Sequence, residues 1–136
     1  MKKLFTILLV TILTSCVTEP PKSNTDYKNI IGKLIKIGNL EVAQYDFPKE
    51  MNWDDAKEAC EALGQGWRLP DEDELDLLFQ NKGKIGGFAK DLPYWSSTES
   101  YAYNNVYVTR QDFNNGDQLR DYKEFKSYVR AVRTFK

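Results

Sequence analysis

The feature that most constrains this chain is a short apolar run that ends near a cysteine. Lys2 and Lys3 make the N-terminus positive, and Leu4 to Leu13 is apolar apart from two threonines. The run is about ten residues long, whereas a helix that spans a bilayer needs about twenty. A charged start before a short apolar stretch is typical of a cleaved signal peptide rather than a membrane span. We therefore expect only the rest of the chain to fold.

Residues 13–16, Leu-Thr-Ser-Cys, resemble the lipobox of bacterial lipoproteins. The resemblance implies that residues 1–15 are removed and that Cys16 carries a diacylglyceryl group, so that its partner is a membrane. Two or more acyl chains anchor a protein stably. We expect a lipid-anchored cell-envelope protein, with the outer membrane favoured because Val17 is not aspartate; periplasmic and surface-facing placements both stay open. An ordinary signal peptide with a chance cysteine is the alternative.

The remainder divides into a tether and one domain. Residues 16–28 form the lipidated N-terminus and a polar, proline-rich linker, which has no means of packing. Residues 29–136 suit one domain with one core. If Cys16 is lipidated, Cys60 has no partner for a disulfide, so packing alone must hold the domain. Cys60 falls on the apolar face of a predicted helix, where we expect a buried and inert thiol.

Charge and the absence of histidine exclude several function classes. Removing residues 1–15 takes two of 19 basic residues, which leaves 17 against 20 acidic ones. A negative domain of this kind is not a typical nucleic-acid-binding protein. The chain has no histidine, and so lacks the commonest zinc ligand and the base of most serine and cysteine hydrolases. We expect no enzyme, cofactor or metal site, although carboxylate chemistry stays a minor alternative.

Local patterns predict a hairpin followed by two helices. Strands are expected at about 30–37 and 40–46, joined through Gly38-Asn39. A first helix runs over residues 52–63, with Asn52 as its cap.

The second helix begins at Asp71, which has capping-box spacing with Glu74. The acidic residues of its first turn suit the helix dipole better than catalysis. The glycines of residues 81–91 predict a loop. Further strands are expected at 94–98, 105–113, 118–122 and 128–135, the middle two joined by Asn114-Asn115-Gly116.

The order of strands, two helices and strands argues for an α+β fold. GWRLP at residues 66–70, YWSSTE at 94–99 and VRAVR at 129–133 resemble, in this order, the Lcl C-terminal-domain family. The resemblance covers residues 50 to the end and, more weakly, those from about 30. It implies a C-type-lectin-like fold with two helices packed on a small antiparallel β structure.

Several motif residues of this resemblance are interpreted first as structural. Trp67 and Trp95 are large apolar anchors. Arg68 is expected to bind a carboxylate or backbone carbonyls, and residues 96–98 to be a hydrogen-bonded strand end rather than nucleophiles. Calcium-dependent sugar-binding lectins of this fold resemble one another in Glu-Pro-Asn or Gln-Pro-Asp and Trp-Asn-Asp strings, which do not occur here. We therefore expect any binding to be independent of calcium.

The leading hypothesis is a non-enzymatic binding or adhesion module with a glycan or envelope protein as ligand. Tyrosine and asparagine give contact area and hydrogen bonds at low entropic cost. One alternative is that the tyrosines of residues 101–107 belong to the core. Another is that the protein is a structural subunit of an envelope or surface assembly. A second possible surface is the basic C-terminus, residues 120–136. The candidate ligand-binding residues are Tyr101, Tyr103, Asn104, Asn105, Tyr107 and Arg110.

Overall fold

The computed structural model describes residues 27–102, 104 and 106–135. The expected signal peptide, Cys16 and residues 17–26 of the expected tether lie outside the described residues. The last two residues of the expected tether are described: Tyr27 packs against Phe47, and Lys28 begins a short helix. Within the described part of the chain, no helix is long and apolar enough to cross a membrane.

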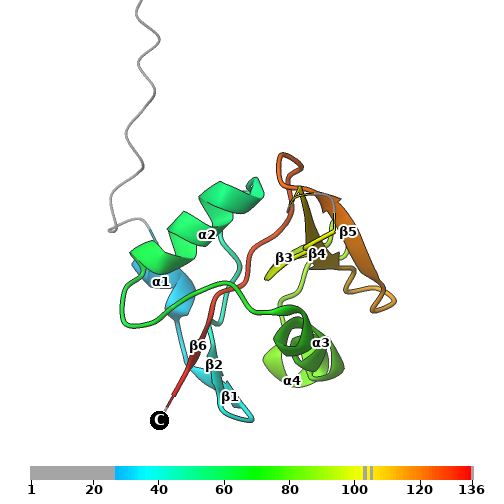
Figure 1. The fold of residues 1–136 in the computed structure, drawn as a ribbon. Coiled ribbons are helices and arrows are strands. Elements are labelled where there is room, and N and C mark those ends of the chain that lie inside the picture. Colours follow the sequence, from blue (N-terminus) through cyan, green and yellow to red (C-terminus); the bar gives the residue numbers. More distant parts are fainter. Residues whose placement is uncertain (1–26, 103, 105, 136) are drawn as a thin grey trace, which may run out of the picture.

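Two small antiparallel sheets and two main helices make up the domain (Figure 1). One sheet has the order β1-β2-β6 and the other β3-β4-β5. The helices are α1 (Lys28–Ile31), α2 (Trp53–Ala62), α3 (Glu72–Gln80) and α4 (Lys82–Ile85). The strands are β1 (Ile35–Ile37), β2 (Leu40–Val42), β3 (Tyr94–Glu99), β4 (Tyr107–Gln111), β5 (Gln118–Tyr122) and β6 (Val132–Thr134).

The C-terminal segment, residues 127–132, runs between the two sheets and joins them (Figure 1). Its backbone hydrogen-bonds with Ala43, Phe47 and Met51 on one side. On the other side it bonds with residues 93–95, and Val132 exchanges two hydrogen bonds with Arg68. Because neighbours surround this segment, most of its side chains are buried.

Both predicted helix caps are confirmed. The Asn52 side chain accepts a hydrogen bond from the Asp55 amide at 2.9 Å. Asp71 accepts from the Glu74 amide at 2.8 Å, and the Glu74 carboxylate accepts in return from the Asp71 amide at 2.8 Å. This capping box satisfies two amides that the first turn of α3 leaves without helical partners. The buried position expected for Cys60, on α2, is also confirmed, and burial raises the pKa of its thiol.

The expected strand boundaries were wrong in four places, one of which is β4, regular only over Tyr107–Gln111 instead of 105–113. Residues 28–31 form α1, and Gly32 (φ +52°) ends it, so β1 starts only at Ile35. The chain after β2 turns away to bond with the C-terminal segment rather than extending the hairpin to residue 46. Only 132–134 of the expected last strand is regular, because residues 127–131 bridge two sheets instead of extending one.

A short helix, α4, occupies part of the predicted loop. The Asn81 side chain donates to the Leu77 carbonyl at 2.9 Å, and the chain turns directly into α4. Ile85 is buried in the same apolar cluster as Leu75 and Leu78 of α3. This apolar anchor holds a helical turn that the neighbouring glycines would otherwise disfavour.

The core has two apolar clusters, and a buried arginine forms an ion pair within it. Trp53, Trp67 and Trp95 are buried in the first cluster, which confirms the anchor role expected for Trp67 and Trp95. Arg130, only 1% exposed, lies between the clusters and binds Asp46 through Nε to Oδ1 at 2.6 Å. Its other nitrogens donate to backbone carbonyls of residues 43, 86 and 87. Burial raises the pKa of the Asp46 carboxyl, although Arg130 and a hydrogen bond from Tyr94 act to lower it.

Candidate binding surface

Exposed apolar side chains gather in one part of the chain. Of the eight large hydrophobic residues exposed among those described, five lie between residues 101 and 125. These belong to the β3–β4 loop, to β5 and to the turn that follows it. The five are Tyr101, Val106, Leu119, Tyr122 and Phe125.

Three aromatic rings form a row that we call the aromatic edge: Tyr107, Tyr122 and Phe125. The Tyr107 and Tyr122 ring centres are 4.7 Å apart, and those of Tyr122 and Phe125 are 5.9 Å apart. The Tyr107 hydroxyl donates to the Tyr122 hydroxyl at 3.0 Å. Tyr122 and Phe125 remain 43% and 48% exposed, so the row presents apolar surface with polar groups at one end.

Strand register and one tight turn create this row. β4 and β5 pair antiparallel with Tyr107 opposite Tyr122. The turn between them ends at Gly116, which has φ +84° and lies so close to α3 that a Cβ atom would come within 2.5 Å of the Phe79 ring. A larger residue at position 116 would be strained at this φ and would force the Phe79 ring or the hairpin to shift. The sequence Asn114-Asn115-Gly116 thus sets the register of the hairpin and allows its turn to pack closely against α3.

Arg110 lies beside the aromatic edge rather than in it. Its guanidinium is 5.8 Å from the rings of both Trp95 and Phe125. It forms an ion pair with Asp121 and donates to the Ser127 hydroxyl at 3.2 Å. The Nε atom is buried and has no hydrogen-bond partner among the described residues. Arg110 therefore lies near the Phe125 ring with its charge paired to Asp121.

The structure separates the six residues that the sequence singled out. Tyr101 is 90% exposed in the turn after β3, and Asn104 is exposed with φ +57°. Tyr107 and Arg110 are half-buried on β4. Tyr103 and Asn105 lie outside the described residues.

Sequence reasoning missed Tyr122 and Phe125. A signal for Tyr122 was present, because a hairpin centred on Asn114-Asn115 places residue 122 opposite residue 107. No comparable signal marks Phe125, since it lies in a turn after the strand.

The basic residues of the C-terminus do not form one surface, which corrects that hypothesis. Arg130 is buried, as described above. Arg133 binds Glu41 at 2.6 Å, and Lys123 binds Glu99 at 2.7 Å. Lys136 lies outside the described residues. The remaining cations of this set, Arg120 and Lys126, are exposed, so three of the five described cations already have a carboxylate partner within the domain.

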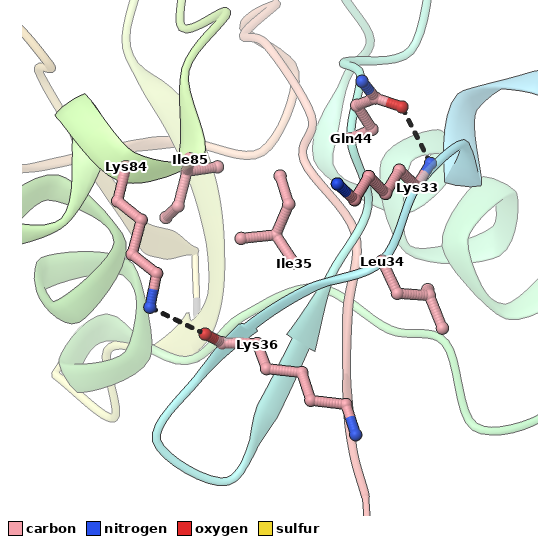
Figure 2. A pocket seen from close by; sticks show the side chains of 7 residues that line it. All are labelled: Lys33, Leu34, Ile35, Lys36, Gln44, Lys84 and Ile85. Atoms are coloured by element: carbon pink, nitrogen blue, oxygen red, sulfur yellow. Dashed lines mark hydrogen bonds between the residues drawn. The ribbon is translucent and has the colours of Figure 1, made fainter.

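A hollow of about 550 Å³ lies elsewhere, between β1 and α4 (Figure 2). Its walls combine lysines with apolar side chains. The lining residues are Lys33, Leu34, Ile35, Lys36, Gln44, Lys84 and Ile85. No residue of the aromatic edge contributes to it, so the domain offers two separate surfaces.

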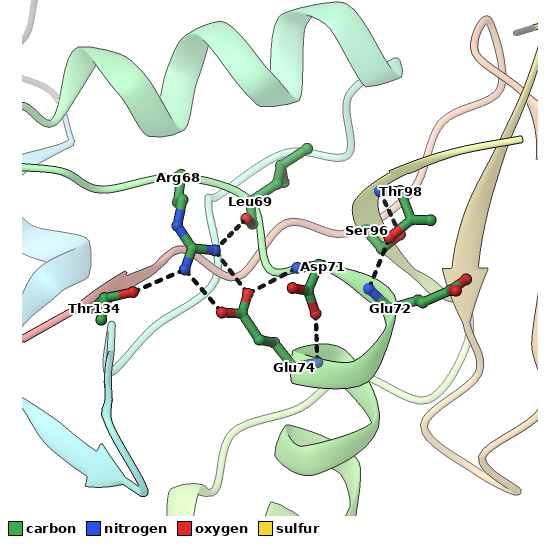
Figure 3. A network of polar contacts seen from close by, with 8 residues as sticks. All are labelled: Arg68, Leu69, Asp71, Glu72, Glu74, Ser96, Thr98 and Thr134. Atoms are coloured by element: carbon green, nitrogen blue, oxygen red, sulfur yellow. Dashed lines mark hydrogen bonds and ion pairs between the residues drawn. The ribbon is translucent and has the colours of Figure 1, made fainter. Parts of the chain in front are cut away.

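A polar network fixes α3 against both sheets (Figure 3). Arg68 donates to both oxygens of Glu74, at 2.7 and 2.8 Å, and to the Leu69 carbonyl. Burial alone would raise the pKa of Glu74, but the hydrogen bonds from Arg68 and the Asp71 amide, with the Arg68 charge, lower it overall. The predicted carboxylate and carbonyl contacts of Arg68 are confirmed.

The strand that carries Ser96 and Thr98 belongs to the same network. Thr98 Oγ1 accepts from the Glu72 amide at 2.9 Å, and Ser96 Oγ accepts from the Thr98 amide at 3.0 Å. Residues 96 and 98 are thus hydrogen-bonded parts of a strand end, as expected. Further along α3, Glu72 and Asp76 accept from Thr109 and Gln111 of β4. These contacts hold the sheet that carries the aromatic edge.

Among the residues that the structure describes, no group of three or more acidic, cysteine or histidine side chains is placed to hold a metal ion. The acidic side chains of α3 nearest the sheet are bound to Arg68, Thr109 and Gln111. The features left for recognition are the aromatic edge and the hollow.

The model of the Lcl C-terminal domain family matches residues 23–133. Comparison with curated protein sequences finds no match. Among solved structures, the snake venom toxin convulxin is similar with a TM-score of 0.59 at 10% identity, covering 77% of this chain and 97% of that chain. Botrocetin has a TM-score of 0.55 at 13% identity and covers 76% and 98%.

Rhodocetin, solved in complex with the integrin α2-A domain, has a TM-score of 0.53 at 12% identity and covers 75% of this chain and 96% of that chain. At these identities the likeness concerns the fold alone. These neighbours are C-type-lectin-like, so the fold class expected from the sequence is confirmed.

Proposed function

We propose, from the premise that this chain belongs to the Lcl C-terminal domain family, that its folded part is a non-enzymatic module that binds a protein ligand at the aromatic edge. Binding there is independent of calcium. The single observation that carries the proposal is the row of Tyr107, Tyr122 and Phe125, because it concentrates aromatic surface on two paired strands and the turn after them.

The composition of the row favours protein recognition. Tyrosine and phenylalanine bury large areas at a low cost in side-chain entropy, and tyrosine is enriched among the residues that dominate interface energies. The nearby charges of Arg110 and Lys123 are neutralised by Asp121 and Glu99. These two cations are therefore already paired within the domain, and the three rings supply apolar contact area. A protein ligand also agrees with the complexes solved for similar folds, rhodocetin with an integrin domain and botrocetin with the von Willebrand factor A1 domain.

The module is displayed in the cell envelope by lipid on Cys16, with the outer membrane as its site. The sequence of residues 1–16 supports this part of the proposal. Replacement Cys16→Ser removes the acceptor sulfur, so the protein should no longer be labelled by a clickable fatty acid in cells. Labelling that persists in the Cys16→Ser variant would contradict the lipid anchor.

Photo-crosslinking in the producing cell tests the binding surface. A benzoylphenylalanine at position 125 should give a discrete crosslinked protein band, since this ring lies at the outer end of the row. The matched control is the same amino acid at position 45, because Tyr45 is 53% exposed and is outside the aromatic edge. Tyr122→Ser should abolish the band at position 125.

Four outcomes would decide between these functions. A band at position 125 but not at position 45 supports a protein ligand, and a band formed in every cell with one abundant envelope protein would indicate a structural subunit instead. Equal bands at both positions, or none at either, would count against the aromatic edge. Saturable binding on a glycan array that survives a calcium chelator and is lost in Tyr122→Ser would replace the protein ligand with a sugar.

A further inference from the structure

The hollow between β1 and α4 gathers positive charge although the domain as a whole is acidic. Three of its lining residues are lysines, and none is aspartate or glutamate. Figure 2 shows Lys33 and Lys84 extending toward it from opposite walls, with Ile35 projecting between them. The hollow therefore combines ammonium groups at its rim with an apolar interior.

The backbone that carries Lys33 is held by a close approach. Gln44 accepts a hydrogen bond from the Lys33 amide at 2.7 Å. The contact depends on Gly32, where a Cβ atom would come within 2.4 Å of the Gln44 amide oxygen and φ is +52°. On the opposite wall, the Lys84 ammonium reaches the carbonyl of Lys36 at 3.4 Å. This long contact leaves the Lys84 ammonium with N–H groups to offer.

In a second, smaller hollow, a lysine ammonium has closer contacts within the domain than that of Lys84. This second hollow has a volume of about 230 Å³ and lies on the other side of α4, lined by Lys82 and Lys90 among others. The Lys82 ammonium donates to the Phe113 carbonyl at 3.0 Å and lies 4.3 Å from the Phe79 ring centre. Within the described part of the chain, Lys33 and Lys84 have no ion pair, whereas Lys36 lies 4.0 Å from Glu41. The two unpaired cations thus face the same larger hollow.

We propose that this hollow binds a phosphate ester, with Lys33 and Lys84 at the phosphate oxygens and Ile35 and Ile85 against the carbon skeleton. Lysine is a compact point charge that suits phosphate. A volume of about 550 Å³ falls in the range of small-molecule sites. The same chemical group occurs on soluble phosphate esters and on the headgroups of anionic phospholipids. The proposal does not depend on protein binding at the aromatic edge.

Nuclear magnetic resonance titration of the isotopically labelled full chain tests the proposal and its two sources. Glycerol 3-phosphate represents the soluble ester, and dihexanoyl phosphatidylglycerol, kept below its micelle concentration, represents the headgroup. Glycerol and dihexanoyl phosphatidylcholine are the neutral and zwitterionic comparisons. We expect saturable shifts of the backbone amides of Lys33, Ile35, Ile85 and Gly86. The variant Lys33→Glu/Lys84→Glu should bind at least tenfold more weakly.

The matched control is Lys49→Glu/Lys126→Glu, because both lysines are exposed, lie outside the hollow and change the net charge equally. It should bind within twofold of the unmodified chain. Lys33→Gln/Lys84→Gln, with its fold checked by circular dichroism, guards against misfolding of the glutamate variant. Shifts with glycerol 3-phosphate assign a soluble ester, and shifts with the lipid alone assign a headgroup. No saturable shift with either, or equal weakening in the control, overturns the proposal.

Discussion

Strands β2 and β5 show how differently one domain can use its strands. β2 lies between β1 and β6, and its residues Leu40, Glu41 and Val42 are at most 7% exposed. β5 pairs only with β4, and four of its five residues are exposed. Burial at β2 supplies folding free energy, whereas β5 contributes little burial and leaves its side chains for contact with other molecules.

Charged residues follow the same division. Glu41 on β2 is buried and bound to Arg133 across the sheet. Arg120 on β5 is exposed and forms no ion pair within the described part of the chain. A buried charge needs its partner, while a solvated one does not. Substitutions on the two sides should therefore differ mainly in what they do to stability.

The largest expected effect tests the buried side of this comparison. Arg130→Leu leaves the Asp46 carboxylate without its ion-pair partner in the interior, which should lower the free energy of unfolding by about 3–5 kcal/mol. Urea denaturation followed by tryptophan fluorescence measures the change. Arg120→Leu on β5 serves as the control and should shift stability by no more than about 0.5 kcal/mol. An equal loss of unfolding free energy in Arg130→Leu and Arg120→Leu would show that the buried and the exposed arginine do not differ in their effect on stability.

A leucine on each strand gives a second test of the difference in burial between β2 and β5. Leu40→Ala on β2 creates a cavity and should lower the free energy of unfolding by about 2–5 kcal/mol. Leu119, on β5, is 39% exposed, so Leu119→Ala should lower it by about 1 kcal/mol or less. The same denaturation experiment measures both. If Leu119→Ala proves as costly as Leu40→Ala, β5 is part of the core in solution.

The stabilising contribution of Glu74, which caps α3 and binds Arg68, should depend on pH. Because the folded pKa of Glu74 lies below its ordinary value, its stabilising contribution is fully present above that ordinary value, near 4.5. The contribution is lost as pH falls through the folded pKa. Glu74→Gln should therefore lower the free energy of unfolding by about 1 kcal/mol at pH 7.

The difference between Glu74→Gln and the unmodified chain should shrink below pH 4.5, as the carboxyl of Glu74 becomes protonated. Urea denaturation between pH 3 and pH 7 gives both curves. Glu58→Gln is a suitable control, since Glu58 is exposed on α2. Parallel curves for the unmodified chain and Glu74→Gln would show that the capping box does not carry the effect.

The smallest expected change in stability is at the aromatic edge itself. Phe125→Ser removes a ring that is 48% exposed, and it should change the free energy of unfolding by about 0.5 kcal/mol. In the crosslinking assay, with the photoreactive residue moved to position 122, the same variant should weaken the protein band. A loss above about 2 kcal/mol would mean that the ring serves packing rather than recognition.

Sequence reasoning succeeded where the cause of a structure is local. Asn52 and Asp71 mark helix starts because a cap bonds within three residues of itself. It failed at Arg130, since its partner Asp46 is 84 positions away and an arginine is ordinarily expected in solvent. Apolar and polar residues do not alternate along residues 128–131, because this segment is surrounded by other parts of the chain and residues 129–131 are all buried. The aromatic edge was predicted only in part. Tyr107 lies in a segment rich in tyrosine and asparagine, which the sequence analysis singled out. The position of Phe125 depends on the conformation of the turn after β5, which the sequence does not indicate.

The C-terminal segment has a consequence for the order in which the domain can form. Residues 127–132 supply the backbone contacts that join residues 43–51, 68 and 93–95, so the two sheets can be joined through these contacts only when the last part of the chain has been synthesised. A nascent chain that ends at Phe125 contains α2, α3 and the β4–β5 hairpin, but it lacks residues 127–132. Joining of the two sheets is therefore a late step of folding, whereas the β1–β2 and β4–β5 hairpins can pair before it.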